Sequence, residues 1–209
     1  VEKLFGDFLI SVTSFFRDPE SFKYLEKKVL HDLEAHQRSD KPIRVWVPGC
    51  ASGEEAYSLA MLLIENITAN RKHIKLQIFA SDVDDRALEV ARAEDHTYRV
   101  SPELRDSVVF ANQNVLADAP FSKLDIISRR NLLIYLNSEA QERIIRMFHF
   151  ALNDGGLLFL GSSETVSSFE ELFQPLSKKF KLYKRVGKAH SRPYYFPVKP
   201  RVYGDVQIS

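Results

Sequence analysis

Five short apolar segments, each about as long as one buried β-strand, alternate with amphipathic helical segments along most of this chain. The predicted strands lie at residues 43–47, 76–80, 108–111, 124–128 and 157–161. Parallel strands are buried on both faces and are joined by helical crossovers, so they appear as continuous apolar runs separated by helices. The alternation therefore predicts an α/β fold with a parallel, doubly wound sheet.

Several polar residues indicate where the helices begin. Asp18 directly precedes Pro19, a pair typical of the start of a helix, and we expect this helix to run to about His36. Ser52 and Glu55 have the spacing of a capping box, which gives Glu55 a purely structural interpretation as the partner of Ser52. Asp84 is placed to cap the next helix.

The C-terminal third departs from the alternation. A helix is predicted over residues 138–151, with Gly155 and Gly156 separating it from the fifth strand. Residues 173–176 and 180–185 follow with no helix between them. We therefore expect an antiparallel hairpin at one edge of the sheet.

Composition excludes several classes of protein. The 209 residues fit one domain, and a single cysteine excludes an internal disulfide or a zinc site built on several thiolates. The six histidines lack ligand spacing, so we expect no metal. No apolar run approaches the ~20 residues of a membrane span, which predicts a cytoplasmic protein without membrane insertion.

Charge is distributed unevenly. Residues 176–209 carry 9 basic side chains and 1 acidic one, whereas the preceding residues are acidic overall. A basic tail can bind nucleic acid or an anionic membrane, but its lysines alternate with Phe180, Leu182 and Tyr183, as on the solvated face of a strand. Because the acidic body lacks a broad basic face, we expect no nucleic-acid partner.

Candidate ligand-binding residues follow the first two strands. Gly49 and Gly53 allow a tight turn and close approach of a ligand, while Glu54 and Glu55 would repel a pyrophosphate at the helix start. Asp82 ends the second strand, where a carboxylate can accept the hydroxyls of a ribose. This combination favours a positively charged nucleoside, and S-adenosylmethionine fits that description.

Five blocks carry a resemblance to a known family: residues 13–18, 44–58, 80–84, 130–135 and 155–164. Together they resemble the chemotaxis receptor methyltransferases, the CheR family, and most closely the versions fused to methylesterase and sensor kinase modules. The resemblance implies a Rossmann-like, S-adenosylmethionine-dependent methyltransferase sheet, mostly parallel with an antiparallel C-terminal edge hairpin. It implies a catalytic domain over residues 18–186, preceded by the end of a helical segment at 1–17 and followed by a tail or linker at 187–209.

The implied reaction transfers a methyl group from S-adenosyl-L-methionine to a glutamate side chain of a receptor or a fused signalling domain. The products are a methyl ester and S-adenosyl-L-homocysteine. The catalytic residues carried over are Arg17, Arg130 and Tyr135. The cofactor-binding residues carried over are Thr13, Arg17, Gly49, Gly53, Glu55, Asp82, Asn114, Val115, Arg129 and Arg130.

Two features depart from the family pattern. Arg129 stands where the family commonly has a cysteine, so an extra charge enters the site. The Glu94 to Val100 junction is shorter than the family's, so we expect the receptor-docking β-subdomain to be truncated or disordered. These departures leave open a non-catalytic cofactor-binding or scaffolding domain. A nucleic-acid methyltransferase is disfavoured, since no Asn-Pro-Pro-Tyr type motif is present.

Overall fold

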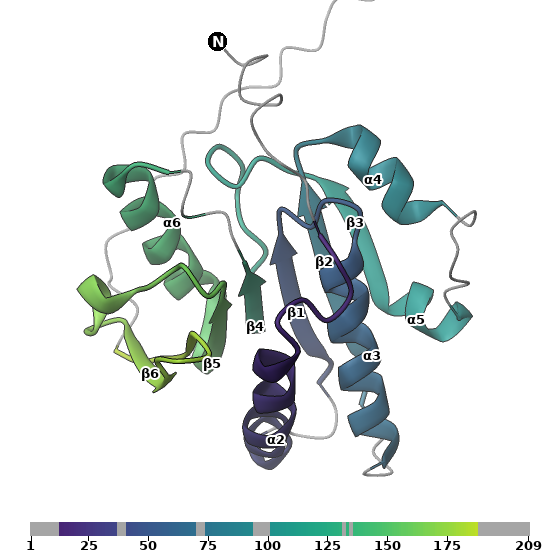
Figure 1. The fold of residues 1–209 in the computed structure, drawn as a ribbon, viewed down its shortest axis with the longest axis horizontal. Coiled ribbons are helices and arrows are strands. Elements are labelled where there is room, and N and C mark those ends of the chain that lie inside the picture. The colour runs from purple at the N-terminus through teal and green to yellow at the C-terminus, as the bar shows by residue number, and fades with distance from the viewer. Residues whose placement is uncertain are drawn as a thin grey trace, which may run out of the picture.

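A seven-stranded sheet runs through the part of the chain that the computed structural model describes, residues 13–36, 41–69, 74–93, 101–130, 133 and 136–187 (Figure 1). The strand order is β3-β2-β1-β4-β5-β7-β6. β1 to β5 pair in parallel, whereas β7 is antiparallel to both β5 and β6. The predicted fold class and the edge hairpin are confirmed. The strands are β1 (Ile43–Pro48), β2 (Leu76–Asp82), β3 (Val108–Asn112), β4 (Leu124–Arg129), β5 (Leu152–Leu160), β6 (Phe173–Ser177) and β7 (Leu182–Arg185).

Helices cover both faces of the sheet. One face packs against α2 (Pro19–His36), α3 (Glu54–Ala69), α4 (Asp85–Arg92) and α5 (Pro102–Ser107), and the other against α6 (Ser138–Ala151). The 3-10 helix η2 (Ser167–Phe169) contributes Phe169 to the α6 side. In Figure 1, α6 lies well apart from α2 and α3.

Alternate residues of each central strand enter the two cores. In β1, Val45 and Val47 pack on the α3 side, while Trp46 packs on the α6 side. Trp46 is fully buried and its indole N–H donates to the Ser81 hydroxyl at 2.9 Å. The pleat thus explains why a parallel strand buried on both faces has no polar alternation.

The structure confirms the start and end expected for α2 and the capping role of Asp84, whose side chain accepts from the Arg86 amide. The expected boundary before the fifth strand is wrong. β5 begins at Leu152, directly after α6, so Gly155 and Gly156 lie within the strand. The pairing of β4 with β5 shifts register between Leu124 and Ile126, which indicates a bulge beside the glycines.

The short helix α5 was not expected from the sequence. Ser101 caps it by accepting from the Leu104 amide, and Pro102 occupies its first turn. This is the pattern already used for Asp18 and Pro19. Its length of 6 residues is too short for helical periodicity to reveal.

The sheet reverses its order between β1 and β4. β2 and β3 extend from one side of β1, and β5 extends from the far side of β4. In open α/β sheets, ligands bind beyond the carboxyl ends of the strands at this point of reversal. We call the carboxyl ends of β1 and β4, with the turns that follow them, the switch-point site. Among the described helices, none combines the length and apolar character that crossing a bilayer requires.

Candidate functional site

The turn between β1 and α3 is built from left-handed backbone. Gly49, Ala51 and Gly53 have φ angles of 67°, 47° and 91°. The Gly49 and Cys50 amides both donate to the Ser81 carbonyl at the end of β2, at 2.5 and 3.0 Å. The turn is therefore held against β2, with its residues at the switch-point site.

The two glycines of this turn serve different contacts. A Cβ on Gly53 would come within 3.1 Å of Ala91 and of the Phe110 ring, so Gly53 allows α3 to pack against α4 and β3. A Cβ on Gly49 would lie 2.0 Å from the Arg129 guanidinium. Both positions were predicted to admit a ligand, yet Gly53 meets the protein's own core and Gly49 meets Arg129.

Asp82 is fixed by two backbone amides. Its carboxylate accepts from the Ala51 amide at 2.8 Å and from the Asp84 amide at 3.0 Å. The side chain thus joins the end of β2 to the β1–α3 turn. Each carboxylate oxygen has a second lone pair, so this arrangement still leaves capacity to accept hydroxyl groups.

Glu55 crosses the switch-point site instead of capping its own helix. It accepts a hydrogen bond from the Ser128 hydroxyl of β4, while Ser52 donates to Glu54 at 2.7 and 3.0 Å. The capping-box interpretation of Glu55 is therefore wrong. Burial raises the pKa of Glu55, and the nearby Arg130 guanidinium acts in the opposite direction.

Arg129 ends β4 and reaches across to β1. Its Nη1 donates to the carbonyl oxygens of Pro48 and Gly49, at 2.7 and 2.8 Å. The residue is 7% exposed, and its Nε is buried without a hydrogen-bond partner among the described residues. Burial lowers the pKa of Arg129 to about 10, even though Glu164, Glu55 and Asp82 act to raise it.

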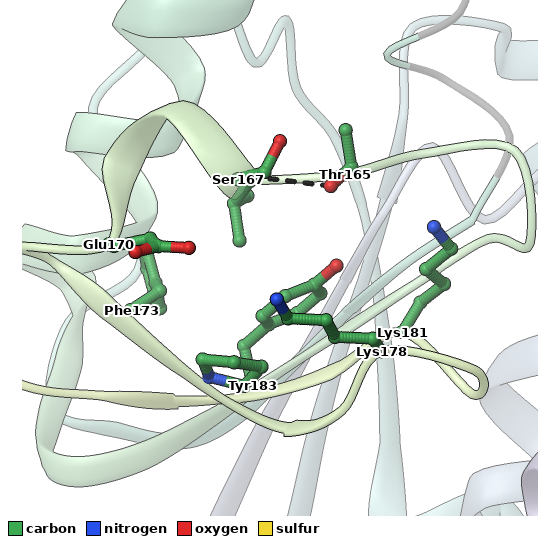
Figure 2. Close-up of a pocket in the computed structure, with 9 residues that line it drawn as sticks. Thr165, Ser167, Glu170, Phe173, Lys178, Lys181 and Tyr183 are labelled. Carbon is green, nitrogen blue, oxygen red and sulfur yellow. Dashed lines mark hydrogen bonds between the residues drawn. The ribbon is translucent and has the colours of Figure 1, made fainter.

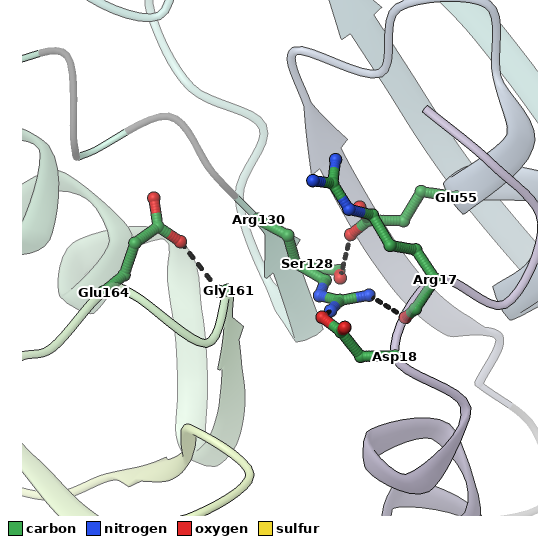
Figure 3. A network of polar contacts seen from close by, with 7 residues as sticks. All are labelled: Arg17, Asp18, Glu55, Ser128, Arg130, Gly161 and Glu164. Atoms are coloured by element: carbon green, nitrogen blue, oxygen red, sulfur yellow. Dashed lines mark hydrogen bonds and ion pairs between the residues drawn. The ribbon is translucent and has the colours of Figure 1, made fainter. Parts of the chain in front are cut away.

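Arg130 ties the segment before α2 to the sheet (Figure 3). Its guanidinium donates to the Arg17 carbonyl and forms an ion pair with Asp18. It also lies over the rings of Phe22 and Phe159, at 5.7 and 5.2 Å from their centroids. Arg130 therefore acts through its neighbours, by fixing the backbone from which Arg17 extends.

A second contact fixes the same segment. The Phe16 amide donates to the Ser58 hydroxyl of α3 at 2.9 Å. Phe16 and Asp18 have left-handed φ angles of 47° and 59°, a conformation that non-glycine residues adopt at a cost. Arg17 lies exposed between them, and Thr13, half-buried, is the first described residue.

Glu164 is a residue whose role the sequence did not reveal. It is 2% exposed, and its two carboxylate oxygens accept from the Leu133 amide at 2.6 Å and the Gly161 amide at 2.7 Å. Glu164 thereby ties the end of β5 to the segment after β4. Figure 3 shows its contact with Gly161. It lies in the 155–164 block that carried the family resemblance, but no pattern distinguishes a buried carboxylate from an exposed one.

The remaining predicted residues are less closely tied to this arrangement. Asn114 follows β3, where its side chain accepts from the Leu116 amide in a turn, and Val115 packs against the core on the α6 side. The backbone amide of the neighbouring Gln113 donates to the backbone carbonyl of Asp82 at 2.9 Å. The prediction for Tyr135 lies outside the described residues, as does the Glu94 to Val100 junction.

Cys50 is buried beside the turn. Burial, followed by the nearby Asp82, raises the pKa of Cys50 to about 12. A thiol with this pKa is protonated at neutral pH and is a poor nucleophile. Cys50 therefore fills space beside the turn and is not placed to act as a nucleophile.

A pocket of about 120 Å³ lies elsewhere, between η2 and the β6–β7 hairpin (Figure 2). It is lined by residues such as Thr165, Lys178 and Tyr183. None of the predicted site residues is among its lining residues. It is therefore separate from the switch-point site.

A doubly wound sheet with a glycine turn and strand-end carboxylates at its point of reversal belongs to the class of α/β domains that bind nucleotide-like ligands. Among solved structures, the DszA carbon methyltransferase shares this fold, with a TM-score of 0.51, 16% identity, and coverage of 71% of this chain and 36% of that one. The family described as "CheR methyltransferase, SAM binding domain" matches residues 11–96 and 91–182. The chain belongs to the CheR methyltransferase family.

Several bacterial proteins are similar to this chain. A 104.1 kDa protein from the hypE 3′ region of Rhodobacter capsulatus is 39% identical over 199 residues, which cover 85% of this chain and 21% of that protein. The chemotaxis protein methyltransferase 2 of Vibrio cholerae is 32% identical over 190 residues, 78% of this chain and 65% of the relative. The chemotaxis protein methyltransferase of Listeria monocytogenes is 33% identical over 179 residues, 75% of this chain and 66% of the relative. The chain thus spans only part of each relative.

The family matches this chain in two parts, which overlap at residues 91–96. This is the region where the sequence analysis noted a shortened junction.

Proposed function

We propose that this chain binds S-adenosylmethionine at the switch-point site and methylates a glutamate carboxylate of a chemoreceptor or related signalling protein in the cytoplasm. The observation that carries the proposal is the position of Glu55 and Asp82. In this chain, which belongs to the CheR family, one carboxylate from α3 and one from β2 flank the glycine turn at the point where the sheet reverses. This chemistry suits a ligand that joins a ribose to a positively charged centre.

The residues present fit that ligand in most respects. Asp82, oriented by the Ala51 and Asp84 amides, would accept the ribose hydroxyls. Glu55 would face the cationic side, and Asn114 and Val115 would adjoin the base. When bound, S-adenosylmethionine supplies a methyl group activated by a sulfonium. The exception is Arg129, whose guanidinium already occupies the face of Gly49.

The chain's own residues supply positioning and charge. A glutamate substrate is ionised at neutral pH, because its ordinary pKa is about 4.3, so no strong general base is required. The exposed Arg17 would orient that carboxylate. Arg130 would hold Arg17 in place by donating a hydrogen bond to the backbone carbonyl of Arg17. We propose that Tyr135 also adjoins the reacting centre.

A methylation assay tests this proposal. The chain is incubated with S-adenosylmethionine labelled on the methyl group and with receptor signalling fragments, and the modified protein is then treated with alkali. Alkali hydrolyses a carboxyl methyl ester and releases its labelled methyl group as methanol. Label that resists alkali, as an N-methyl group would, contradicts the carboxylate substrate. Arg17→Ala should lower turnover more than it lowers affinity for S-adenosylhomocysteine.

One observation favours a second candidate, a non-catalytic domain that binds the cofactor or its product within a larger signalling protein. Arg129 places a buried positive charge beside the glycine turn, at the site where the positively charged methyl donor would bind. Tight binding of S-adenosylhomocysteine without turnover on any receptor fragment would support this candidate. For either candidate the partner can be another domain of the same protein, where a linker supplies effective concentrations near millimolar.

A further inference from the structure

The switch-point site is bridged by one side chain. Arg129 comes from the end of β4, and both of its backbone acceptors, the Pro48 and Gly49 carbonyls, lie at the end of β1. The Arg129 guanidinium fits here only because Gly49 has no Cβ. Three atoms of the guanidinium lie within 2.7 Å of the position that a Cβ on Gly49 would take. The bridge therefore depends on both residues.

Burial of the Arg129 guanidinium costs desolvation free energy. Its guanidinium is buried and hydrogen-bonded to neutral carbonyls, and its Nε has no hydrogen-bond partner among the described residues. Burial outweighs the three carboxylates that act on it, Glu164, Glu55 and Asp82. A buried cation in this position contributes a strong local field to the site that surrounds it.

Carbonyl oxygens at the end of a strand are natural acceptors for a cationic ligand group. Here Arg129 already uses the carbonyls of Pro48 and Gly49. A ligand with a positive centre loses these acceptors and approaches a fixed positive charge. A neutral ligand of the same shape meets no such repulsion.

We propose that Arg129 sets the charge selectivity of the switch-point site, by weakening the binding of the cationic sulfonium ligand relative to that of the neutral thioether ligand. The inference rests on the proposed function, because it takes S-adenosylmethionine and S-adenosylhomocysteine as this ligand pair. The two molecules differ by one methyl group and one positive charge. The ratio of their dissociation constants therefore isolates the effect of charge.

Calorimetry with both ligands tests the proposal on the wild-type chain, Arg129→Met and Arg129→Lys. Removal of the positive charge in Arg129→Met should improve affinity for S-adenosylmethionine about tenfold more than affinity for S-adenosylhomocysteine. Arg129→Lys keeps the charge and should keep the wild-type ratio. Circular dichroism and thermal unfolding establish that each variant is folded.

Arg44→Met is the matched control. Arg44 lies at the amino end of β1, away from the switch-point site, and its Nε is also buried without a hydrogen-bond partner among the described residues. This variant removes a comparable charge and should leave the ratio unchanged.

Three results would overturn the proposal. An unchanged ratio in Arg129→Met, whether both affinities gain equally or neither changes, would show that Arg129 acts by volume or not at all. Weaker binding of both ligands would show that Arg129 holds the ligand instead of selecting it. If neither ligand binds any variant, the proposed function fails together with this inference. Binding with an unaltered ratio refutes the inference alone.

Discussion

Replacement of Arg130 by methionine tests whether this side chain fixes the segment that carries Arg17. Methionine has a similar length but cannot donate to the Arg17 carbonyl or pair with Asp18. The exposures of the two partners differ, since the side chain of Arg130 is 2% exposed and that of Asp18 is 46% exposed. Water can therefore solvate Asp18 once Arg130 is gone.

The expected loss of unfolding free energy in Arg130→Met follows from these contacts. Loss of a hydrogen bond from a charged donor costs about 1.5 to 3 kcal/mol. The ion pair adds about 0 to 1 kcal/mol because Asp18 is half exposed. Contact with the Phe22 and Phe159 rings adds about 1 kcal/mol, part of which the methionine sulfur retains. Relief of arginine desolvation offsets part of this sum. We expect a net loss of about 1 to 3 kcal/mol.

Urea denaturation of the wild type, Arg130→Met, Asp18→Asn and the double variant measures this effect and its coupling. The coupling energy between the two positions should be about 1 kcal/mol or less, and affinity for S-adenosylhomocysteine should fall in Arg130→Met. If Arg130→Met is as stable as the wild type or more so, desolvation dominates. Arg130 would then not hold this segment in place.

Three further predictions concern the turn between β1 and α3. Asp82→Ala should weaken the binding of S-adenosylhomocysteine by about 1.5 to 3 kcal/mol. It should also lower the stability of the chain, because the Ala51 amide loses its acceptor. Calorimetry that shows an unchanged affinity would remove Asp82 from the site. Because the pKa of Glu55 is raised in the folded chain, the contribution of Glu55 to stability is present below the ordinary pKa of glutamate and is lost as the pH rises through the raised pKa. The unfolding free energy of Glu55→Gln should therefore rise relative to that of the wild type as the pH increases from below the ordinary pKa of glutamate through the raised pKa of Glu55. A difference that does not depend on pH would contradict the raised pKa. Cys50 should resist a thiol reagent at about pH 8 in the native chain and react fully in urea; fast native labelling would show that the thiol is accessible.

The order of strands and helices could be predicted because hydrophobic periodicity is a local signal. Asp84 before α4 is a case in which one capping residue marked the start of a helix correctly. The start of β5 was missed because its glycines, which usually mark a turn, lie here in a strand beside a bulge. Local patterns therefore gave the order of elements but not every boundary.

The partners of the site residues could not be predicted in the same way. Glu55 had a local partner available in Ser52, yet it bonds to Ser128, which lies 73 residues away in sequence. Arg129 could be recognised as a departure from the family, but its position over Gly49 depends on how β1 and β4 are paired. Such contacts arise only when the sheet is assembled, so a single sequence does not reveal them.

The bridge from Arg129 to Pro48 also bears on how the chain folds. It joins residues 81 positions apart, whereas β1 and β2 are separated by little more than one helix. The entropic cost of closing a loop rises with the length of chain that the loop encloses. We therefore expect the β1–α3–β2 unit to assemble before β4 docks beside it. The ligand would then have no complete site until that docking occurs. In a refolding experiment, binding of S-adenosylhomocysteine should appear only with the last folding phase, and binding in an earlier phase would contradict this order.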